Sequence, residues 1–350
     1  MKLSPNTFAQ LRDFLSHEYG LFFEASKVTF LENRILPFIE KLNCIDMNQF
    51  IAKIKEFPDQ RRELLDALTT NETWFFRHPR HFDILREEIL LPLIRARQKA
   101  GPREISIWSA GSSIGAETFS IAITVREALL DLPGWEARII GSDISAEAIQ
   151  RANKAVFSSK ELNLLSPILM NRYFFPQSAE GFKVKPEIRS MVAFERMNLL
   201  DPWPNRVFDV IFCRNTMIYF HEGTKATLTE RFFQALVPGG TFFTSATETL
   251  HWKGENAFEK IFIRGEYVYR KRTHGRPFVL YRFRTPADLL RALNILAKHN
   301  FEYQLLNIPQ ESPNQPRKAI FIAKAFQKKV EEVFANAALK ASRREEVIRQ

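Results

Sequence analysis

Residues 103 to 270 alternate between short apolar runs and amphipathic stretches, and no other feature limits the possible folds of the chain as strongly. Strands that alternate with helices form βαβ units, whose neighbouring strands run parallel. The sequence therefore predicts an α/β fold with a mostly parallel, Rossmann-like sheet. The expected strands are Ile105–Ala110, Ala137–Ser142, Val207–Cys213 and Gly240–Ser245, and the helices between them are Glu117–Leu130, Ser145–Ala155 and Lys225–Leu236.

Two segments outside this alternation have patterns of their own. Residues 1–67 carry apolar side chains at helical spacing, which predicts a small N-terminal helical domain. Residues 174–196 contain two short strand-like runs, Gly181–Lys185 and Met191–Phe194, which we expect to form a small antiparallel β insertion.

The C-terminal segment predicts an accessory α/β extension whose default role is contact with a protein or with the main domain. A β-α-β-β pattern covers residues 277–325, and the last 25 residues have the charge and spacing of a helix. The predicted domains are therefore 1–67, 68–272 and 273–350.

Composition restricts the location and the partners of the chain. The formal net charge is +10, and residues 273–350 hold 14 Lys and Arg against 7 Asp and Glu, a net charge of +7. This basic character favours acidic partners. No uncharged apolar stretch reaches about 18 residues, no signal peptide is evident, and Cys44 and Cys213 are too few for a disulfide framework or a metal site. We expect a cytoplasmic protein without membrane insertion.

Polar side chains begin directly after the predicted strand Val207–Cys213. Arg214, Asn215 and Tyr219 stand where a parallel strand would end. In open α/β sheets the ligand crevice lies outside the carboxyl ends of the strands. These side chains are therefore expected at the edge of a binding site.

A loop with two glycines, 110–115, follows the first predicted strand. Glycine allows a sharp turn and a close approach of the backbone to a ligand. The Gly-x-x-x-Gly spacing does not match the dinucleotide fingerprint, and a structural βα turn is the alternative. Glu117 at the start of the next helix would repel a phosphate, which favours a ligand with amino or hydroxyl groups.

Asp143 directly follows the second predicted strand, where a carboxylate can accept hydrogen bonds from both hydroxyls of a ribose. The alternative role is to cap the following helix, although Ser145 is already a suitable cap. A glycine loop and a ribose-binding carboxylate without phosphate-binding residues fit S-adenosylmethionine.

Three specific motifs follow one another in the chain. They are Thr70-Asn71-Glu72-Thr73-Trp74-Phe75-Phe76-Arg77, Trp108-Ser109-Ala110-Gly111 and Phe212-Cys213-Arg214-Asn215-x-Met217-Ile218-Tyr219-Phe220. Together they resemble the chemotaxis receptor glutamate methyltransferases (CheR type), and the similarity spans about residues 8–270. The resemblance implies an S-adenosylmethionine-dependent methyltransferase sheet, with S-adenosylhomocysteine as product. Its substrate would be glutamate side chains on the cytoplasmic helical bundle of a chemoreceptor, on which residues 1–67 would dock.

The resemblance also implies roles for matching residues. Asn71, Thr73 and Arg77 would lie at the methionine end of the cofactor, Asp143 at the ribose, and Asn198 and Leu199 at the adenine. For Asn198 a turn at a strand end is the alternative. Arg77, on the cofactor carboxylate or the acceptor, and Tyr219, on the acceptor glutamate, are the catalytic candidates. The cofactor-binding set is Asn71, Thr73, Arg77, Ala110, Gly111, Glu117, Asp143, Asn198, Leu199, Arg214 and Asn215.

The chain departs from the family pattern at several places, one of them mild, since Ser112 stands where cysteine is common. The family usually has Gly-Glu-Glu-Pro-Tyr where this chain has Gly115-Ala116-Glu117-Thr118-Phe119, so the first glutamate is replaced by alanine. Members that tether to a receptor's C-terminal peptide have a glycine-rich loop in the insertion, whereas 176–181 is short and contains one glycine. We therefore expect tether-independent methylation.

The predicted chemistry needs no general base, because a glutamate carboxylate with a reference pKa of about 4.3 is already ionised at neutral pH. Alternatives are a methyltransferase for another acidic protein and a non-enzymatic S-adenosylmethionine-binding signalling module. A nucleic-acid methyltransferase is disfavoured, because the chain has no aromatic stacking platform between Lys and Arg side chains. It also lacks the Asn/Asp-Pro-Pro-Tyr/Phe motif of amino-methylating enzymes.

Overall fold

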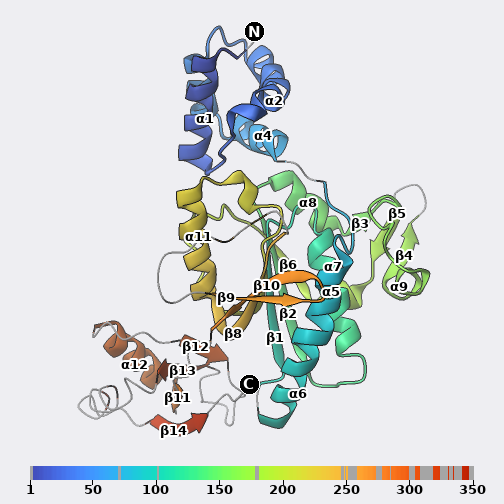
Figure 1. The fold of residues 1–350 in the computed structure, drawn as a ribbon, viewed down its shortest axis with the longest axis vertical. Coiled ribbons are helices and arrows are strands. Elements are labelled where there is room, and N and C mark those ends of the chain that lie inside the picture. The colour runs from blue at the N-terminus through green and yellow to red at the C-terminus, as the bar shows by residue number, and fades with distance from the viewer. Residues whose placement is uncertain are drawn as a thin grey trace. The chain divides into compact units, whose positions relative to one another are not determined.

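A computed structural model describes most of the chain (Figure 1). The described residues form parts of two compact units, Met1–Pro92 with Glu104–Leu236 and Gly240–Lys271, and Leu93–Arg103 with Val237–Gly239 and Arg272–Gln350. The described residues are 3–69, 72–100, 102–177, 181–245, 248, 250, 258–272, 278–283, 285–298, 304–307, 318–323, 330, 334 and 341–346.

The first unit begins with a helical domain. Ser4 starts the first helix, because its hydroxyl oxygen accepts a hydrogen bond from Thr7 N at 3.2 Å, and Asp46 caps the third by accepting from Gln49 N at 2.8 Å. Gly20 ends the first helix. The helices are α1 (Pro5–Tyr19), α2 (Val28–Lys41), α3 (Met47–Glu56) and α4 (Pro58–Leu68).

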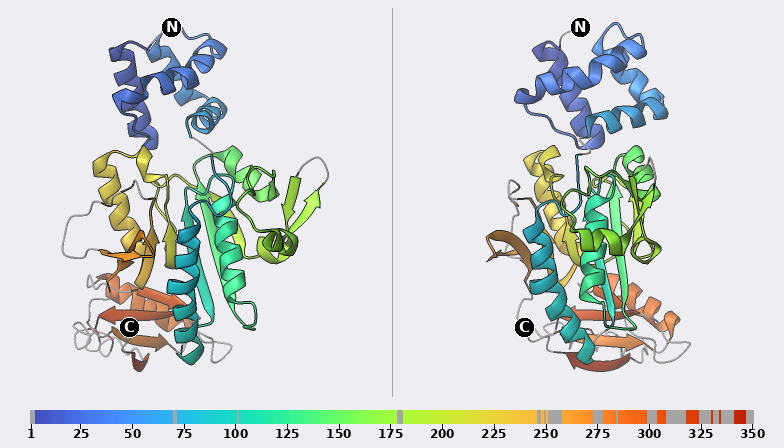
Figure 2. Two further views of the ribbon diagram at one scale, coloured as in Figure 1. Left: turned by 45° about the vertical axis from the view of Figure 1, so that its right-hand side comes forward. Right: turned by 90° about the vertical axis from the view of Figure 1, so that its right-hand side faces the viewer.

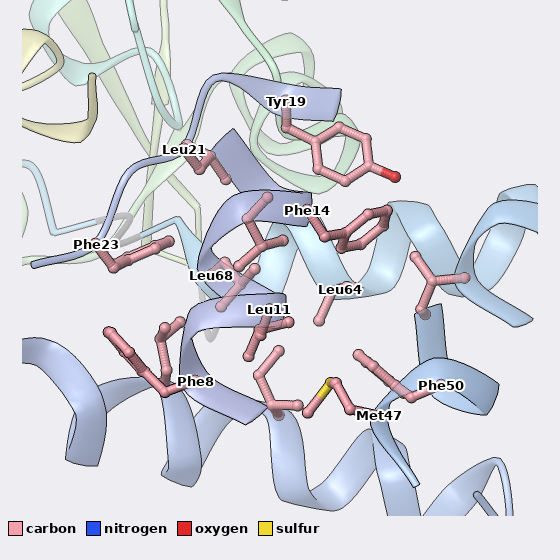
Figure 3. Close-up of a cluster of buried hydrophobic side chains, with 14 of the residues drawn as sticks. Phe8, Leu11, Phe14, Tyr19, Leu21, Phe23, Met47, Phe50, Leu64 and Leu68 are labelled. Carbon is pink, nitrogen blue, oxygen red and sulfur yellow. The ribbon is translucent and has the colours of Figure 1, made fainter. Parts of the chain in front are cut away.

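Buried apolar side chains hold these helices together. Figure 3 shows Leu11 and Phe14 of α1 pointing toward Met47 and Phe50 of α3 and toward Leu64 of α4. All five side chains are buried, and each such burial stabilises the fold by about 1.5–3 kcal/mol. The sequence prediction of helices in this segment is confirmed.

The remainder of the first unit is built around a seven-stranded sheet. Five neighbouring strands run parallel, and a hairpin extends the sheet antiparallel at one side. The mostly parallel α/β sheet that the sequence predicts is thereby confirmed. Across the sheet the strands are β6 (Val192–Arg196), β2 (Glu136–Asp143), β1 (Glu104–Ala110), β7 (Phe208–Phe212), β8 (Leu236–Phe243), β10 (Glu266–Lys271) and β9 (Phe258–Ile263).

Helices pack along this sheet, and all residues of the central strand β7 are buried, as expected for a parallel strand covered on both faces. Figure 2 shows α7 running beside the strands, and it contacts β1, β2 and β6. The helices of this region are α5 (Pro79–Ile84), the π-helical segment (Leu85–Leu90) that continues it, α7 (Ala116–Ala128), α8 (Ala146–Lys154) and α11 (Glu222–Ala235). The next helix along the chain after the π-helical segment, α6 (Leu91–Ala100), belongs mostly to the second unit.

The predicted antiparallel insertion exists, but its second strand-like run was assigned to the wrong sheet. The insertion is a three-stranded sheet whose strand Gly181–Val184 lies within the predicted run Gly181–Lys185. The run Met191–Phe194 instead falls largely in β6, which pairs parallel with β2. The short helix α10 lies between the two runs and allows this crossover into the main sheet. The insertion consists of β3 (Val156–Phe157), α9 (Pro167–Tyr173), β4 (Phe174–Gln177) and β5 (Gly181–Val184), with α10 (Pro186–Arg189) after it.

The C-terminal extension has the predicted β-α-β-β order, but the expected final helix does not extend over the last 25 residues. Residues Ala341–Glu346 form a strand, β14, that pairs antiparallel with the first strand of the extension along its whole length. A sheet partner thus outweighs the helical spacing of that segment. The other elements are β11 (Phe278–Phe283), α12 (Pro286–Lys298), β12 (Gln304–Asn307) and β13 (Lys318–Ala323), and the sheet order is β12-β13-β11-β14.

Candidate functional site

Three loops meet at the carboxyl edge of the sheet because the strands that precede them, β2, β1 and β7, are neighbours. The loop after β1 is fixed to the end of β2, since the backbone N–H groups of Gly111 and Ser112 donate to the Ser142 carbonyl at 2.8 and 2.9 Å. Trp108 adds a bond from its indole N–H to the Ser142 hydroxyl at 2.9 Å. The two predicted binding loops are therefore held side by side.

Gly111 brings the loops after β1 and β7 into close contact. Its φ of 80° lies in the left-handed region that glycine adopts without cost. A Cβ at this position would lie 2.0 Å from the Thr216 hydroxyl oxygen. Only glycine fits between these loops.

The Asp143 carboxylate connects the ends of two loops. Oδ2 accepts from Ser113 N at 2.7 Å and Oδ1 accepts from Ser145 N at 2.9 Å. The helix cap is Ser145, which accepts from Ala148 N at 3.0 Å, so the capping alternative for Asp143 is not realised. Burial raises the pKa of the Asp143 carboxyl, while the two N–H donors lower it.

A buried ion pair lies beside this edge. Glu117 Oε2 is 3.5 Å from Arg214 Nε, and Oε1 accepts from the Ser109 hydroxyl at 2.8 Å. Burial raises the pKa of Glu117 and lowers the pKa of Arg214, and each partner opposes the shift of the other. Arg77 joins the group, since its backbone carbonyl accepts from Arg214 Nη2 at 2.6 Å and its guanidinium stacks on the Trp74 ring at 4.7 Å.

Two adjoining cavities occupy the edge and share Gly111, Ser113 and Asn215. The first, which we call the arginine pocket, has a volume of about 470 Å³, and the second, the Asp143 pocket, about 590 Å³. Predicted residues in the arginine pocket are Thr73, Arg77, Gly111, Glu117, Arg214 and Asn215. Those in the Asp143 pocket are Gly111, Asp143, Asn198, Leu199, Asn215 and Tyr219.

Two predicted residues are not placed in these linings, for different reasons. Ala110 is fully buried in the core cluster beneath the edge and lines neither pocket. Asn71 lies outside the described residues. The two catalytic candidates line different pockets, Arg77 the arginine pocket and Tyr219 the Asp143 pocket.

The helical domain contributes to the site, which the sequence did not indicate. Tyr19 and Leu21 line the Asp143 pocket. Phe22 N donates to the Tyr219 carbonyl at 2.7 Å, and Asn198 Nδ2 approaches the Tyr19 carbonyl at 3.5 Å. The turn alternative for Asn198 is also realised, since its Oδ1 accepts from Leu200 N at 3.0 Å.

Glu248 is another residue that sequence reasoning missed. It is buried, and its carboxylate accepts hydrogen bonds from the backbone of the loop after β7, at Asn215 N (2.9 Å) and Ile218 N (3.2 Å). No motif or spacing marks it in the sequence. A lone glutamate beyond a predicted strand reads as a surface residue.

The chain matches known proteins along most of its length. Residues 6–69 match "CheR methyltransferase, all-alpha domain", and residues 71–266 match "CheR methyltransferase, SAM binding domain". The chain belongs to the CheR methyltransferase family. This CheR-family protein is therefore an S-adenosylmethionine-dependent methyltransferase, and the predicted resemblance, enzyme class and cofactor are confirmed.

Curated relatives cover a similar span of this CheR-family chain. The probable chemotaxis protein methyltransferase of Rhizobium etli is 31% identical over 262 residues, which are 73% of this chain and 96% of the relative. The chemotaxis protein methyltransferase of Salmonella typhimurium is 32% identical over 277 residues, 77% of this chain and 91% of the relative. The chemotaxis protein methyltransferase of Escherichia coli is 30% identical over 280 residues, which are 77% of this chain and 92% of the relative.

The pocket chemistry of this CheR-family protein fits S-adenosylmethionine. Each oxygen of Asp143 accepts one backbone N–H and has a second lone pair for a ribose hydroxyl. Arg214 Nε and Nη1 are buried without a hydrogen-bond partner among the described residues, which suits an anionic group in the arginine pocket. Within the described part of the chain no cluster of His, Cys, Asp or Glu suits a metal ion, and no described helix is long and apolar enough to span a membrane.

Proposed function

We propose that this methyltransferase transfers the methyl group of S-adenosylmethionine to glutamate side chains in the cytoplasmic helical bundle of a chemoreceptor. The curated relatives are named chemotaxis protein methyltransferases, which supports a role in chemotaxis. The helical domain, residues 1–67 in the predicted division, docks on the receptor bundle. Residues 68–272 hold the cofactor, and residues 273–350 are an accessory region.

One observation carries the proposal for the site. Arg214 is buried with two guanidinium nitrogens that have no hydrogen-bond partner among the described residues, in a pocket that Arg77 also lines. A buried donor without a partner is costly, whereas a bound carboxylate satisfies it. The described residues that line this pocket include Glu72 and Glu117 as well as the two arginines. A ligand carboxylate completes this arrangement.

The proposed placement divides the cofactor between the two pockets. Thr73, Arg77, Glu117 and Arg214 bind its amino acid end in the arginine pocket, to which Asn71 is assigned by resemblance. Glu117, paired with Arg214, accepts from the amino group. Asp143 binds the ribose, and Asn198 and Leu199 bind the adenine, in the Asp143 pocket. Gly111 and Asn215, which line both pockets, lie where the two halves join.

The chain's own residues act by orientation. The bound cofactor supplies an electrophilic methyl group on a sulfonium. Because the acceptor glutamate is ionised at neutral pH, no residue has to remove a proton. No histidine lines either pocket among the described residues. Tyr219, next to the junction, positions the acceptor carboxylate, and Arg77 holds the cofactor carboxylate; alignment of this kind can supply several kcal/mol.

The decisive experiment incubates the protein with cofactor labelled in its methyl group and with receptor cytoplasmic fragments. The expected product is a base-labile methyl ester on receptor glutamates. A fragment with those glutamates replaced by alanine is the control. Labelling of another acidic protein but not of the receptor would contradict the receptor assignment, and no labelling of any protein would contradict catalysis.

The placement of the cofactor has its own test. Asp143→Ala and Arg77→Ala should each abolish S-adenosylmethionine binding in calorimetry. Asp209→Asn serves as a control, because Asp209 is a buried carboxylate that accepts from Ser106 N at 2.9 Å and lines neither pocket. Unchanged affinity in the two site variants would refute the proposed site.

We further propose that methylation does not require a peptide tether. The insertion loop contains a single glycine, and that glycine has a packing role. Gly181 has a φ of 103°, and a Cβ there would lie 2.3 Å from the Phe157 carbonyl oxygen. Residues 178–180 of the loop lie outside the described residues. Titration with a receptor's C-terminal peptide should show no binding, and micromolar affinity would overturn the proposal.

A further inference from the structure

The carboxylate of Glu248 ties the loop after β7 to the end of β8. Oε2 accepts from Asn215 N at 2.9 Å, and Oε1 accepts from Ile218 N at 3.2 Å. On the other side, Oε2 accepts from Ser245 N at 3.0 Å and from the Ser245 hydroxyl at 2.6 Å. The side chain of Glu248 is buried. One carboxylate thus satisfies three backbone N–H groups from two segments.

One of these bonds is made by a residue with a left-handed backbone conformation. Asn215 has a φ of 57°, in the left-handed region, which asparagine adopts more readily than other residues with a Cβ. A hydrogen bond from its N–H to an ionised acceptor is stronger than one to a neutral acceptor. Glu248 therefore restricts Asn215 to one of the backbone conformations that are open to it.

The held residues are those that face the two pockets. Asn215 lines both of them, Arg214 precedes it and lines the arginine pocket, and Tyr219 follows Ile218 and lines the Asp143 pocket. Glu248 itself lines neither pocket among the described residues. Glu248 can therefore act on a ligand only indirectly, through the loop that it holds or through its charge, which raises the pKa of Glu117 and of Arg214.

We propose that Glu248 is a positioning residue for the cofactor site. It fixes the backbone from Asn215 to Ile218 and thereby keeps the site in the geometry that binds the cofactor. The inference rests on the proposed placement of the cofactor. It predicts that loss of the Glu248 carboxylate weakens cofactor binding without any direct contact. A purely structural role predicts lower stability with unchanged affinity of the folded molecules.

Calorimetric titration with S-adenosylhomocysteine separates these two roles, because it reports affinity and the fraction of competent protein independently. Glu248→Gln replaces an ionised acceptor by an amide whose NH₂ group would face an N–H donor. We expect its Kd to rise about tenfold at unchanged stoichiometry, which corresponds to about 1.4 kcal/mol. A purely structural residue would instead lower the stoichiometry and leave Kd as it is.

Asp209→Asn is the matched control. It makes the same carboxylate-to-amide change at a buried backbone-bonded site on β7, the strand that precedes the loop. Its Kd should equal that of the unaltered protein, whatever its loss of thermal stability. Glu248→Asp, which keeps the charge but is one methylene shorter, covers the case in which Glu248→Gln does not fold, and its Kd should also rise.

Hydrogen–deuterium exchange gives a readout that needs no cofactor. Amides in the peptide that covers 213–220 should exchange faster in Glu248→Gln than in the unaltered protein, and Asp209→Asn should not change them. Unchanged Kd and unchanged exchange in both Glu248 variants would overturn the inference. If Asp143→Ala also keeps full affinity, the cofactor placement itself is wrong. If only the Glu248 variants keep full affinity, the placement stands and the positioning role fails.

Discussion

Arg214 Nη2 donates a hydrogen bond of 2.6 Å to the carbonyl oxygen of Arg77, which lies 137 residues earlier in the chain. The bond joins the motif before α5 to the motif after β7, so two sequence motifs become one wall of the arginine pocket. The bond uses one of the three guanidinium nitrogens of Arg214. The other two, Nε and Nη1, are buried without a hydrogen-bond partner among the described residues.

Arg214→Lys tests whether this fork is needed. Lysine keeps the positive charge but has a single ammonium group, which cannot bond the Arg77 carbonyl and a ligand in the same geometry. We expect S-adenosylhomocysteine to bind at least about tenfold more weakly, or about 1.4 kcal/mol. Isothermal titration calorimetry measures this. An unchanged Kd would show that charge alone is sufficient.

Gly111→Ala should destabilise the protein by about 1–3 kcal/mol, because it combines a left-handed φ with a collision against Thr216. Urea denaturation provides the measurement. Gly223→Ala is the matched control, since a Cβ there would meet only His221 Nδ1, at 3.8 Å. The control lies in α11 and should be neutral or slightly stabilising. Equal effects at both positions would contradict the close-approach argument.

His81 should make stability depend on pH. It is buried, and burial lowers its pKa from 6.5 to about 3. Between these values the unfolded chain binds a proton that the folded protein does not, so stability rises with pH across this window and is lost as the pH falls. At pH 4.5 the loss relative to pH 7 is about 2–3 kcal/mol.

His81→Phe removes this titration and keeps an aromatic ring against Phe243, whose ring centroid is 5.4 Å from that of His81. Urea titrations at pH 7 and pH 4.5 measure the unfolding free energy at each pH. The difference between the two values should be smaller in this variant than in the unaltered protein by about 2–3 kcal/mol. His17→Gln is the control, because the side chain of His17 is 89% exposed. A pH dependence that is identical in His81→Phe and the unaltered protein would exclude His81 as its source.

Tyr219→Phe tests the proposed acceptor role. The phenyl ring preserves the packing of Tyr219 against the helical domain but lacks the hydroxyl. We expect S-adenosylhomocysteine affinity to stay constant and kcat for receptor methylation to fall on the order of tenfold. Calorimetry and single-turnover methyl transfer measure the two quantities. A weaker Kd with unchanged kcat would assign Tyr219 to the cofactor instead.

The central fold was predictable because its signals are local. Each apolar run between Ile105 and Ser245 is bounded by turn residues, and the end of a parallel strand fixes where Asp143 and Arg214 must lie. The same geometry explains why most predicted site residues line two adjoining pockets. Ala110 is an exception, because a strand's last side chain can face the core beneath the loop instead of the ligand.

Longer-range pairing was harder to predict. The run Met191–Phe194 has the same composition whether it joins the insertion or the main sheet, and its partner, β2, lies about 50 residues earlier. The contribution of Tyr19 and Leu21 depends on how the helical domain meets the sheet, which no local pattern encodes. Glu248 was missed for the same reason, since its partners are backbone N–H groups and backbone groups leave no mark in a sequence.

Strand β14 has a practical consequence for anyone who shortens this chain. In the sheet order β12-β13-β11-β14, residues 341–346 cover the flank of β11. A truncation after residue 340 would leave the N–H and C=O groups along that flank of β11 unpaired, and such edges recruit strands from other molecules. Self-association of a trimmed protein would then reflect an uncapped sheet rather than a native oligomer.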